Sequence, residues 1–159
     1  MNATDILKYG QQTVYQTLNS FPIEACEQPG ACGTWSVKDI IAHLASYEQV
    51  LVDILASFTG RATTPALDKF IELGSLFNDS QVNLRKEKTL QEVLQELNET
   101  HIAAMSLLTT IPAEKLRQTG TLPWYGAEYS LDDVIVYMYY GHKREHSAQI
   151  AAFQDRLRQ

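Results

Sequence analysis

The sequence has few cysteines and no long apolar run. Only Cys26 and Cys32 occur in 159 residues, too few for a disulfide framework, so free thiols in a reducing cytoplasm are expected. No apolar stretch approaches the roughly 18 residues that a membrane span needs. The N-terminal residues lack both the basic and the apolar region of a signal peptide. These absences predict a soluble, cytoplasmic protein.

Clustered basic charge is also missing. The net charge is −6, and the charged residues are spread along the chain. A nucleic-acid backbone calls for a clustered basic face, and a membrane surface calls for a run of lysine and arginine. Neither partner is therefore expected. The sequence also contains no phosphate loop, no nucleophile elbow and no paired-carboxylate motif.

Helical periodicity is the main pattern in the chain, which has only five prolines and eight glycines. Apolar residues recur at helical spacing in four long segments, and no strand pattern competes with them. Three of these segments begin with a Ser or Thr followed three residues later by an acid, which is typical of a capping box. The predicted helices run from Thr4 or Asp5 to about Asn19, from Ser36 to Gly60, from Thr89 to Ile111, and from Ser130 to about Leu157.

A long connection joins the second and third of these helices. It spans residues 61 to 87, with a short helix expected around residues 67 to 77. Four helices with one long crossover are typical of a bundle with non-adjacent connectivity. The length suits one domain, residues 1–159, with its own hydrophobic core. The sequence therefore predicts an all-α four-helix bundle.

Three histidines are expected to face the interior of this bundle. His142 and His146 lie one turn apart, about 40° from each other around the last helix, and His43 falls on the apolar face of the second helix. Three neutral imidazoles could bind one divalent ion and leave coordination positions open. Glu48 and Glu145 are near enough in sequence to accept the second N–H of a ligand. In the alternative interpretation, each histidine is a core residue with a hydrogen-bond partner of its own.

Three further residues are candidates for contact with a small molecule. His101 lies on the inner face of the third helix and could be a fourth ligand, a general base or a substrate contact. A core histidine bonded to a neighbouring Tyr or Glu is the interpretation we favour there. Trp124 and Tyr125 stand in a short loop and either line a pocket mouth or close the end of the bundle.

Three motifs give the chain a family resemblance. They are WSVKDIIAHLASYE, FNDSQVNLRKEKTLQEVLQEL and GHKREHSAQI, in that order along most of the chain. With them the chain resembles the DinB-like/YfiT-like superfamily of metal-binding helical bundles. The resemblance implies an up-down-down-up bundle, frequently a homodimer, with one Zn, Ni, Fe or Mn ion on a histidine triad. Here that triad would be His43, His142 and His146.

The resemblance also implies a range of activities. Relatives include transferases of low-molecular-weight thiols, a maleylpyruvate isomerase, and hydrolase-like self-protection proteins that act on reactive natural products. The crossover motif and the sequence around Trp35 are most similar to the self-protection branch, although some of its members lack the full triad. The leading hypothesis is thus a metal-dependent thiol transferase or hydrolase acting on a reactive small molecule. The alternative is a metal-free module that sequesters a hydrophobic or toxic small molecule.

Overall fold

The computed structural model describes residues 1–61 and 63–159, so only residue 62 of the expected crossover lies outside the described residues. It is all-α, as predicted, and the described residues form no strand. The α-helices are α1 (Ala3–Asn19), α2 (Val37–Ser57), α3 (Pro65–Leu73), α4 (Phe77–Leu84), α5 (Leu90–Leu108), α6 (Ala113–Arg117), α7 (Leu131–Val134) and α8 (His142–Leu157). Short 3-10 turns occupy Ile23–Ala25 and Gly74–Leu76, and a π-helical segment, η3, occupies Ile135–Gly141.

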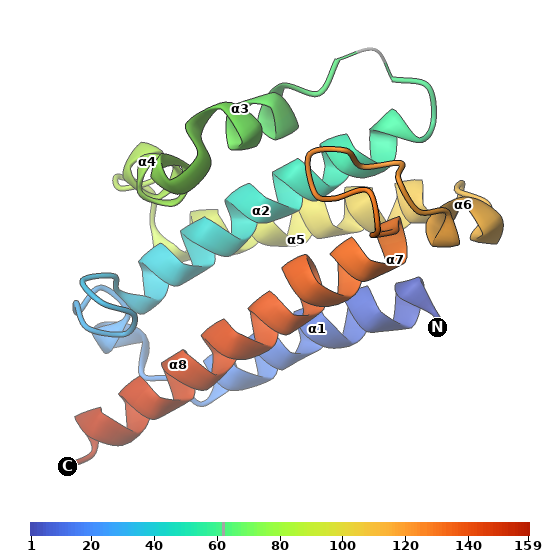
Figure 1. The fold of residues 1–159 in the computed structure, drawn as a ribbon. Coiled ribbons are helices and arrows are strands. Elements are labelled where there is room, and N and C mark those ends of the chain that lie inside the picture. Colours follow the sequence, from blue (N-terminus) through green and yellow to red (C-terminus); the bar gives the residue numbers. More distant parts are fainter. Residues whose placement is uncertain (62) are drawn as a thin grey trace.

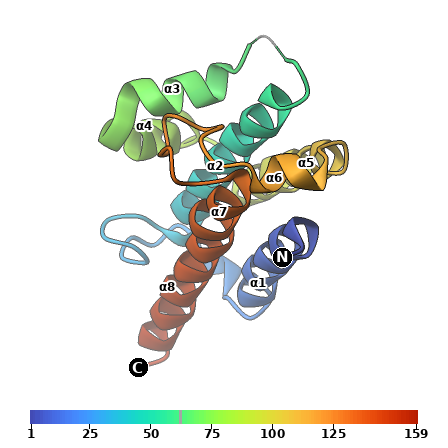
Figure 2. The same ribbon diagram turned by 45° about the vertical axis from the view of Figure 1, so that its right-hand side comes forward.

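Four long rods make up the body of the molecule: α1, α2, α5, and the continuous α7–η3–α8. Figure 1 shows α2 and α5 running in one direction, and α1 and α8 running in the opposite one. These are the directions of an up-down-down-up bundle. Both views place α3 and α4 over α2, outside the four rods (Figures 1 and 2). The crossover therefore forms a partial cover above α2.

The helix starts follow from the local sequence. All three expected caps are capping boxes, at Ser36, Thr89 and Ser130. At the first of them, the Ser36 hydroxyl accepts a hydrogen bond from the Asp39 backbone N–H (3.1 Å), and the Asp39 carboxylate accepts one from the Ser36 N–H (3.0 Å). Such a box satisfies backbone donors that the first turn of a helix leaves free.

Helix α2 is the centre of the core. Seventeen of its 21 residues are buried, against α5 on one side and the α3–α4 cover on the other. The sequence predicts no stretch of this kind, but α2 is long and apolar enough to cross a membrane by length and composition alone. In the structure, 78% of the relevant window is buried. Burial of that kind is typical of the core helix of a water-soluble bundle.

The crossover differs from its prediction. Two helices, α3 and α4, replace the single short helix expected around residues 67 to 77. The break falls at Gly74, whose φ of +52° lies in the left-handed region that favours glycine. The carboxylate of the buried Asp53 on α2 accepts hydrogen bonds from the backbone N–H groups of Ala66 (2.6 Å) and Leu67 (3.2 Å). Asp53 thereby fixes the start of the cover to α2.

The chain between α5 and the last rod also departs from expectation. Helix α5 ends at Leu108 rather than near Ile111, and the short α6 follows it. The last rod, predicted as one uninterrupted α-helix, contains the π segment η3 immediately before His142. A π turn has i→i+5 hydrogen bonds, so residues before and after it are rotated relative to their positions on a uniform α-helix.

Candidate metal centre

Three histidine side chains converge between α2 and α8. The Nε2 atom of His142 lies 2.9 Å from that of His43 and 2.9 Å from that of His146. One ligand atom from each residue falls within 4.8 Å of the other two. The i, i+4 spacing places the two α8 side chains on one face, and α2 presents the third side chain to them. The structure therefore brings together all three predicted ligand residues.

Burial keeps these imidazoles neutral. It is the main cause that lowers the pKa of His43 to about 2 and that of His142 to about 3, with a further contribution from the neighbouring histidines. Burial also lowers the pKa of His146, although its hydrogen bond with Gln149 opposes the shift. Metal ligation requires neutral imidazole, and at neutral pH the three side chains meet that requirement.

The hydrogen bonds of the cluster favour ligands over core histidines. His146 Nδ1–H donates to the Gln149 side-chain oxygen (2.8 Å), which leaves a lone pair on its Nε2. The Nδ1 atoms of His43 and His142 are buried and have no hydrogen-bond partner among the described residues. Outside the cluster, His146 alone of the three has a hydrogen-bond partner among the described residues, whereas His43 and His142 contact only other histidines through their Nε2 atoms. Glu48, considered as an acceptor for the second N–H of a ligand, instead forms an ion pair with Lys143.

The donor set fits a divalent first-row ion. Imidazole nitrogen suits Zn, Ni and Fe, and three protein ligands are the number that leaves room for a substrate or water. No carboxylate belongs to the cluster found among the described residues. His43, His142 and His146 therefore fit the divalent metal ion that the family resemblance implies.

Two aromatic rings enclose the triad. The ring centroid of Trp35 lies 5.0 Å from that of His43, and Tyr47 lies 4.6 Å from the rings of both His43 and His142. Both rings are held by α4, because the Trp35 indole N–H donates to Asp79 (3.1 Å) and the Tyr47 hydroxyl donates to Asn78 (3.1 Å). Sequence reasoning missed Asn78 and Asp79, although both belong to the quoted crossover motif.

A buried ion pair involves Lys143, the residue that follows His142. Lys143 is 2% exposed and bonds the fully buried carboxylate of Glu48. Its ammonium also donates to Gln11 of α1 (2.9 Å). The Nδ1 atom of His101 lies 3.7 Å from the same Glu48 carboxylate. The structure thus places His101 beside Glu48 rather than in the histidine cluster, and a role in substrate binding stays a prediction.

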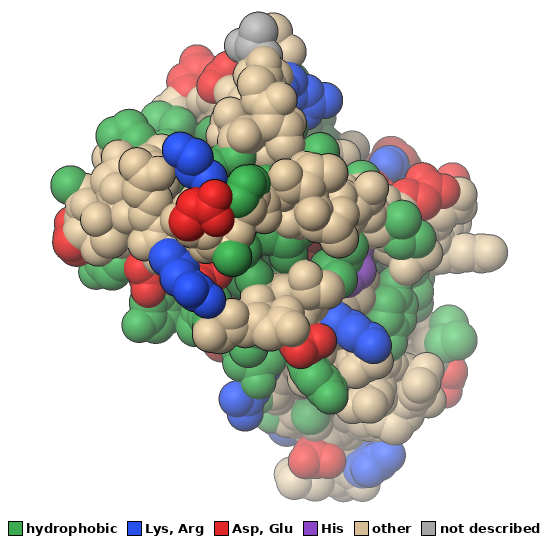
Figure 3. Space-filling model, turned by 90° about the vertical axis from the view of Figure 1, so that its right-hand side faces the viewer, with side chains coloured by type: hydrophobic (Ala, Val, Ile, Leu, Met, Phe, Trp, Pro, Cys, Tyr) green, Lys and Arg blue, Asp and Glu red, His purple; other side chains and the backbone are tan. Residues whose placement is uncertain are grey.

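Trp124 and Tyr125 line a cavity that also includes Tyr47. They therefore share an opening with a residue that contacts two of the predicted ligands. Figure 3 looks onto this end of the bundle, where hydrophobic side chains are interspersed with charged ones and part of a histidine is visible. Whether these two residues contact a substrate stays a prediction.

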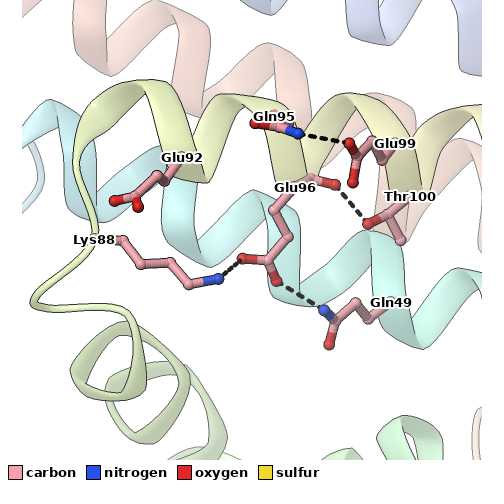
Figure 4. Close-up of a pocket in the computed structure, with 7 residues that line it drawn as sticks. All are labelled: Gln49, Lys88, Glu92, Gln95, Glu96, Glu99 and Thr100. Carbon is pink, nitrogen blue, oxygen red and sulfur yellow. Dashed lines mark hydrogen bonds and ion pairs between the residues drawn. The ribbon is translucent and has the colours of Figure 1, made fainter.

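A second hollow lies on α5 and contains no residue of the triad (Figure 4). Its carboxylates are engaged: Glu96 accepts hydrogen bonds from Lys88 (2.8 Å) and from Gln49 (2.7 Å). Arg85 donates to the same carboxylate. This group ties α2, the end of α4 and α5 together, which is a structural role.

Comparison with known proteins identifies the family. No curated protein and no solved structure matches the chain at a significant level. The sequence model of the DinB superfamily matches residues 6–150, a range that includes all three histidines of the cluster and both residues of the buried ion pair. The match agrees with the motif resemblance and with the helical fold. The chain belongs to the DinB superfamily.

Proposed function

We propose that this protein is a metal-dependent enzyme that acts on a reactive small molecule by thiol transfer or hydrolysis. One observation carries the proposal: three neutral Nε2 atoms converge between α2 and α8, 2.9 Å apart in two of the pairs. His43, His142 and His146 would hold a divalent ion such as Zn, Ni, Fe or Mn. When bound, the ion supplies Lewis acidity, which favours deprotonation of a water or a thiol.

The chain's own residues prepare the site. Gln149 orients the imidazole of His146 through its Nδ1–H, and Trp35 and Tyr47 restrict the space around His43. A shielded site strengthens electrostatic interactions, because less water screens them. These residues bind, orient and exclude water, while the reacting groups come from the substrates.

Two serines and one cysteine among the described residues are poorly suited to act as nucleophiles. The hydroxyls of Ser46 and Ser147 donate to the backbone carbonyls of His43 and Lys143, both at 2.7 Å. Cys26 is buried, and burial raises the pKa of its thiol, which suppresses the reactive thiolate. An external nucleophile, either water or a low-molecular-weight thiol, is consistent with this arrangement.

We further propose that the protein works in the cytoplasm as a homodimer.

The test is elemental analysis of tag-free protein, with His43→Ala and His142→Ala variants and a His101→Ala control. The expected result is about one metal ion per chain in the wild type and in His101→Ala, and loss of the ion in the other two variants. Wild-type protein without metal, even after incubation with Zn or Ni, would overturn the proposal. A metal-free module that sequesters a small molecule would then be the better hypothesis.

Activity follows from the same samples. The metal-loaded protein is mixed with an aryl electrophile and a low-molecular-weight thiol, or with an activated ester, and product formation is followed by absorbance. Turnover by the loaded wild type, lost in His142→Ala, would assign the reaction class. Turnover unchanged in His142→Ala would separate that reaction from the metal site.

A further inference from the structure

The cavity beside the triad is built almost entirely from aromatic rings. It has a volume of about 430 Å³, which lies within the range of small-molecule sites. Four separate parts of the chain contribute: α2, α3, the loop before α7, and the π segment. The lining residues are Tyr47, Phe70, Trp124, Tyr125, Tyr137 and Met138.

The π segment brings two of these residues to the cavity. On a uniform α-helix, Tyr137 would lie about 140° around the axis from His142, on another face. A segment with i→i+5 hydrogen bonds instead brings residues five apart close to one face. The buried Tyr139 donates a hydrogen bond from its hydroxyl to the Tyr47 backbone carbonyl (3.1 Å), which ties the segment to α2 at the cavity wall.

The rings form a continuous path from the cavity to the triad. Tyr47 packs edge-to-face on Phe70, with centroids 5.6 Å apart, and Phe70 packs likewise on Trp124 at 5.9 Å. At the other end of the path, Tyr47 lies 4.6 Å from His142. Tyr47 is therefore both a wall of the cavity and a neighbour of the metal ligands. A molecule in the cavity would contact Tyr47, whose ring packs on His43 and His142.

The described lining offers no cationic partner for an anionic group. Among the described residues that line the cavity, none carries a charged side chain. Burial raises the pKa of the Tyr47 and Tyr125 phenols, so both stay neutral at physiological pH. Met138 adds a thioether, which makes favourable contacts with ring edges. Ring faces, ring edges and a thioether are the surfaces that a neutral aromatic ring prefers.

We infer that this cavity binds the aromatic ring of a substrate next to Tyr47, the residue that links the cavity to the triad. The inference rests on the proposed function for the presence of a reaction, and it narrows the substrates to reactive compounds that carry such a ring. Ring binding itself depends only on the cavity residues.

The test uses the two tryptophans of the chain, of which Trp35 packs on His43 and Trp124 lines the cavity. In an amide-correlation NMR spectrum of the labelled protein, Trp35 and Trp124 each give one indole N–H signal, and a Trp35→Phe variant assigns them. Benzyl alcohol is the probe, and cyclohexylmethanol is its saturated counterpart of similar size and polarity. The expected result is a saturable shift of the Trp124 signal, with benzyl alcohol binding about two- to tenfold more tightly.

Two substitutions locate the effect. Phe70→Leu keeps an apolar side chain but removes a ring from the cavity, and it should weaken benzyl alcohol binding by about two- to tenfold. Tyr9→Leu is the matched control, because Tyr9 lies on α1 with 60% of its surface exposed. This substitution should leave the affinity for benzyl alcohol unchanged. Equal affinity for the two alcohols, no saturation at Trp124, or no effect of Phe70→Leu would each overturn the inference.

Failure of the ring site and failure of the metal site are distinguishable. The titration is run on chelator-treated protein and requires neither metal nor turnover. Binding of the ring without binding of metal would support the aromatic cavity and overturn the proposed metal-dependent function. Binding of metal without binding of the ring would support the metal site and overturn the inference of an aromatic substrate.

Discussion

The buried pair of Glu48 and Lys143 offers a quantitative test of how the bundle is held together. Glu48 is 0% exposed and Lys143 2% exposed, and the pair joins α2 to α8. Burial alone would raise the pKa of the Glu48 carboxyl, but the charge of Lys143 and the neighbouring His101 lower it on balance. The folded protein therefore holds an ionised carboxylate in its interior.

Removing one partner should cost far more than removing both. A Lys143→Met substitution keeps the aliphatic stem but leaves the Glu48 carboxylate buried without its cation, at a cost of about 3–5 kcal/mol. For a chain of this length, about 1 kcal/mol corresponds to roughly 2–4 °C, so the melting temperature should fall by roughly 6–20 °C. In the double variant Glu48→Leu/Lys143→Met no charge is stranded, and most of the lost stability should return.

The assay is urea unfolding followed by circular dichroism at pH 7. All samples are treated with chelator, because Lys143 neighbours His142 and a change in metal content would otherwise enter the comparison. Lys88→Met is the matched control: its ammonium also pairs with a glutamate, but the side chain is 44% exposed. Such a surface pair contributes about 0–1 kcal/mol. The reasoning is refuted if Lys143→Met costs no more than the control, or if the double variant is less stable than either single variant.

Three further predictions follow from the same structure. A chelator should lower the melting temperature of metal-loaded wild type, because binding to the native state stabilises it by about 3–4 kcal/mol at 100 to 1,000 times Kd, and it should not affect a His142→Ala variant. With pKa values of about 2 for His43 and about 3 for His142, these side chains stay neutral when folded but take up protons below about pH 6.5 when unfolded. Metal-free protein should thus lose about 1.4 kcal/mol per pH unit for each histidine as pH falls below about 6.5, and equal urea midpoints at pH 7 and pH 5 would contradict this. Calorimetry should show that Gly10→Ala stabilises the protein by about 0.4–1 kcal/mol, because the new methyl group would lie 3.5 Å from its nearest neighbours. Gly141→Ala should stabilise it less, because its methyl group would lie 3.3 Å from the Val136 carbonyl oxygen.

The parts of the fold that depend on local sequence could be predicted. A Ser or Thr with an acid three residues later specifies a helix start through bonds within one turn, and all three such starts are present. The histidine cluster was also accessible, because helical periodicity places His142 and His146 on one face and His43 on the inner face of α2. Its assembly needs only that these two helices pack together.

The parts that depend on pairing between distant segments could not be predicted. Nothing in the sequence pairs Lys143 with Glu48, and only the packing of α8 on α2 makes them a buried pair. The roles of Asn78 and Asp79 likewise depend on where the crossover lies over α2. A single sequence carries no information on which polar residues of different helices meet. Local patterns therefore located the ligands but not the groups that surround and support them.

The π segment shows most directly how the site depends on a departure from regular structure. Uniform helical periodicity assigns Tyr137 to a different face from His142, about 140° away, and nothing in the sequence Ile135–Gly141 marks the change of period. Yet this segment lies where α7 must continue into α8 while its side chains form part of a cavity with Tyr47. π-helical segments are rare in proteins overall, but those that occur are often at functional sites. Because η3 ends at the residue before His142, the same local change of period sets the faces of a predicted ligand and of the aromatic wall beside it.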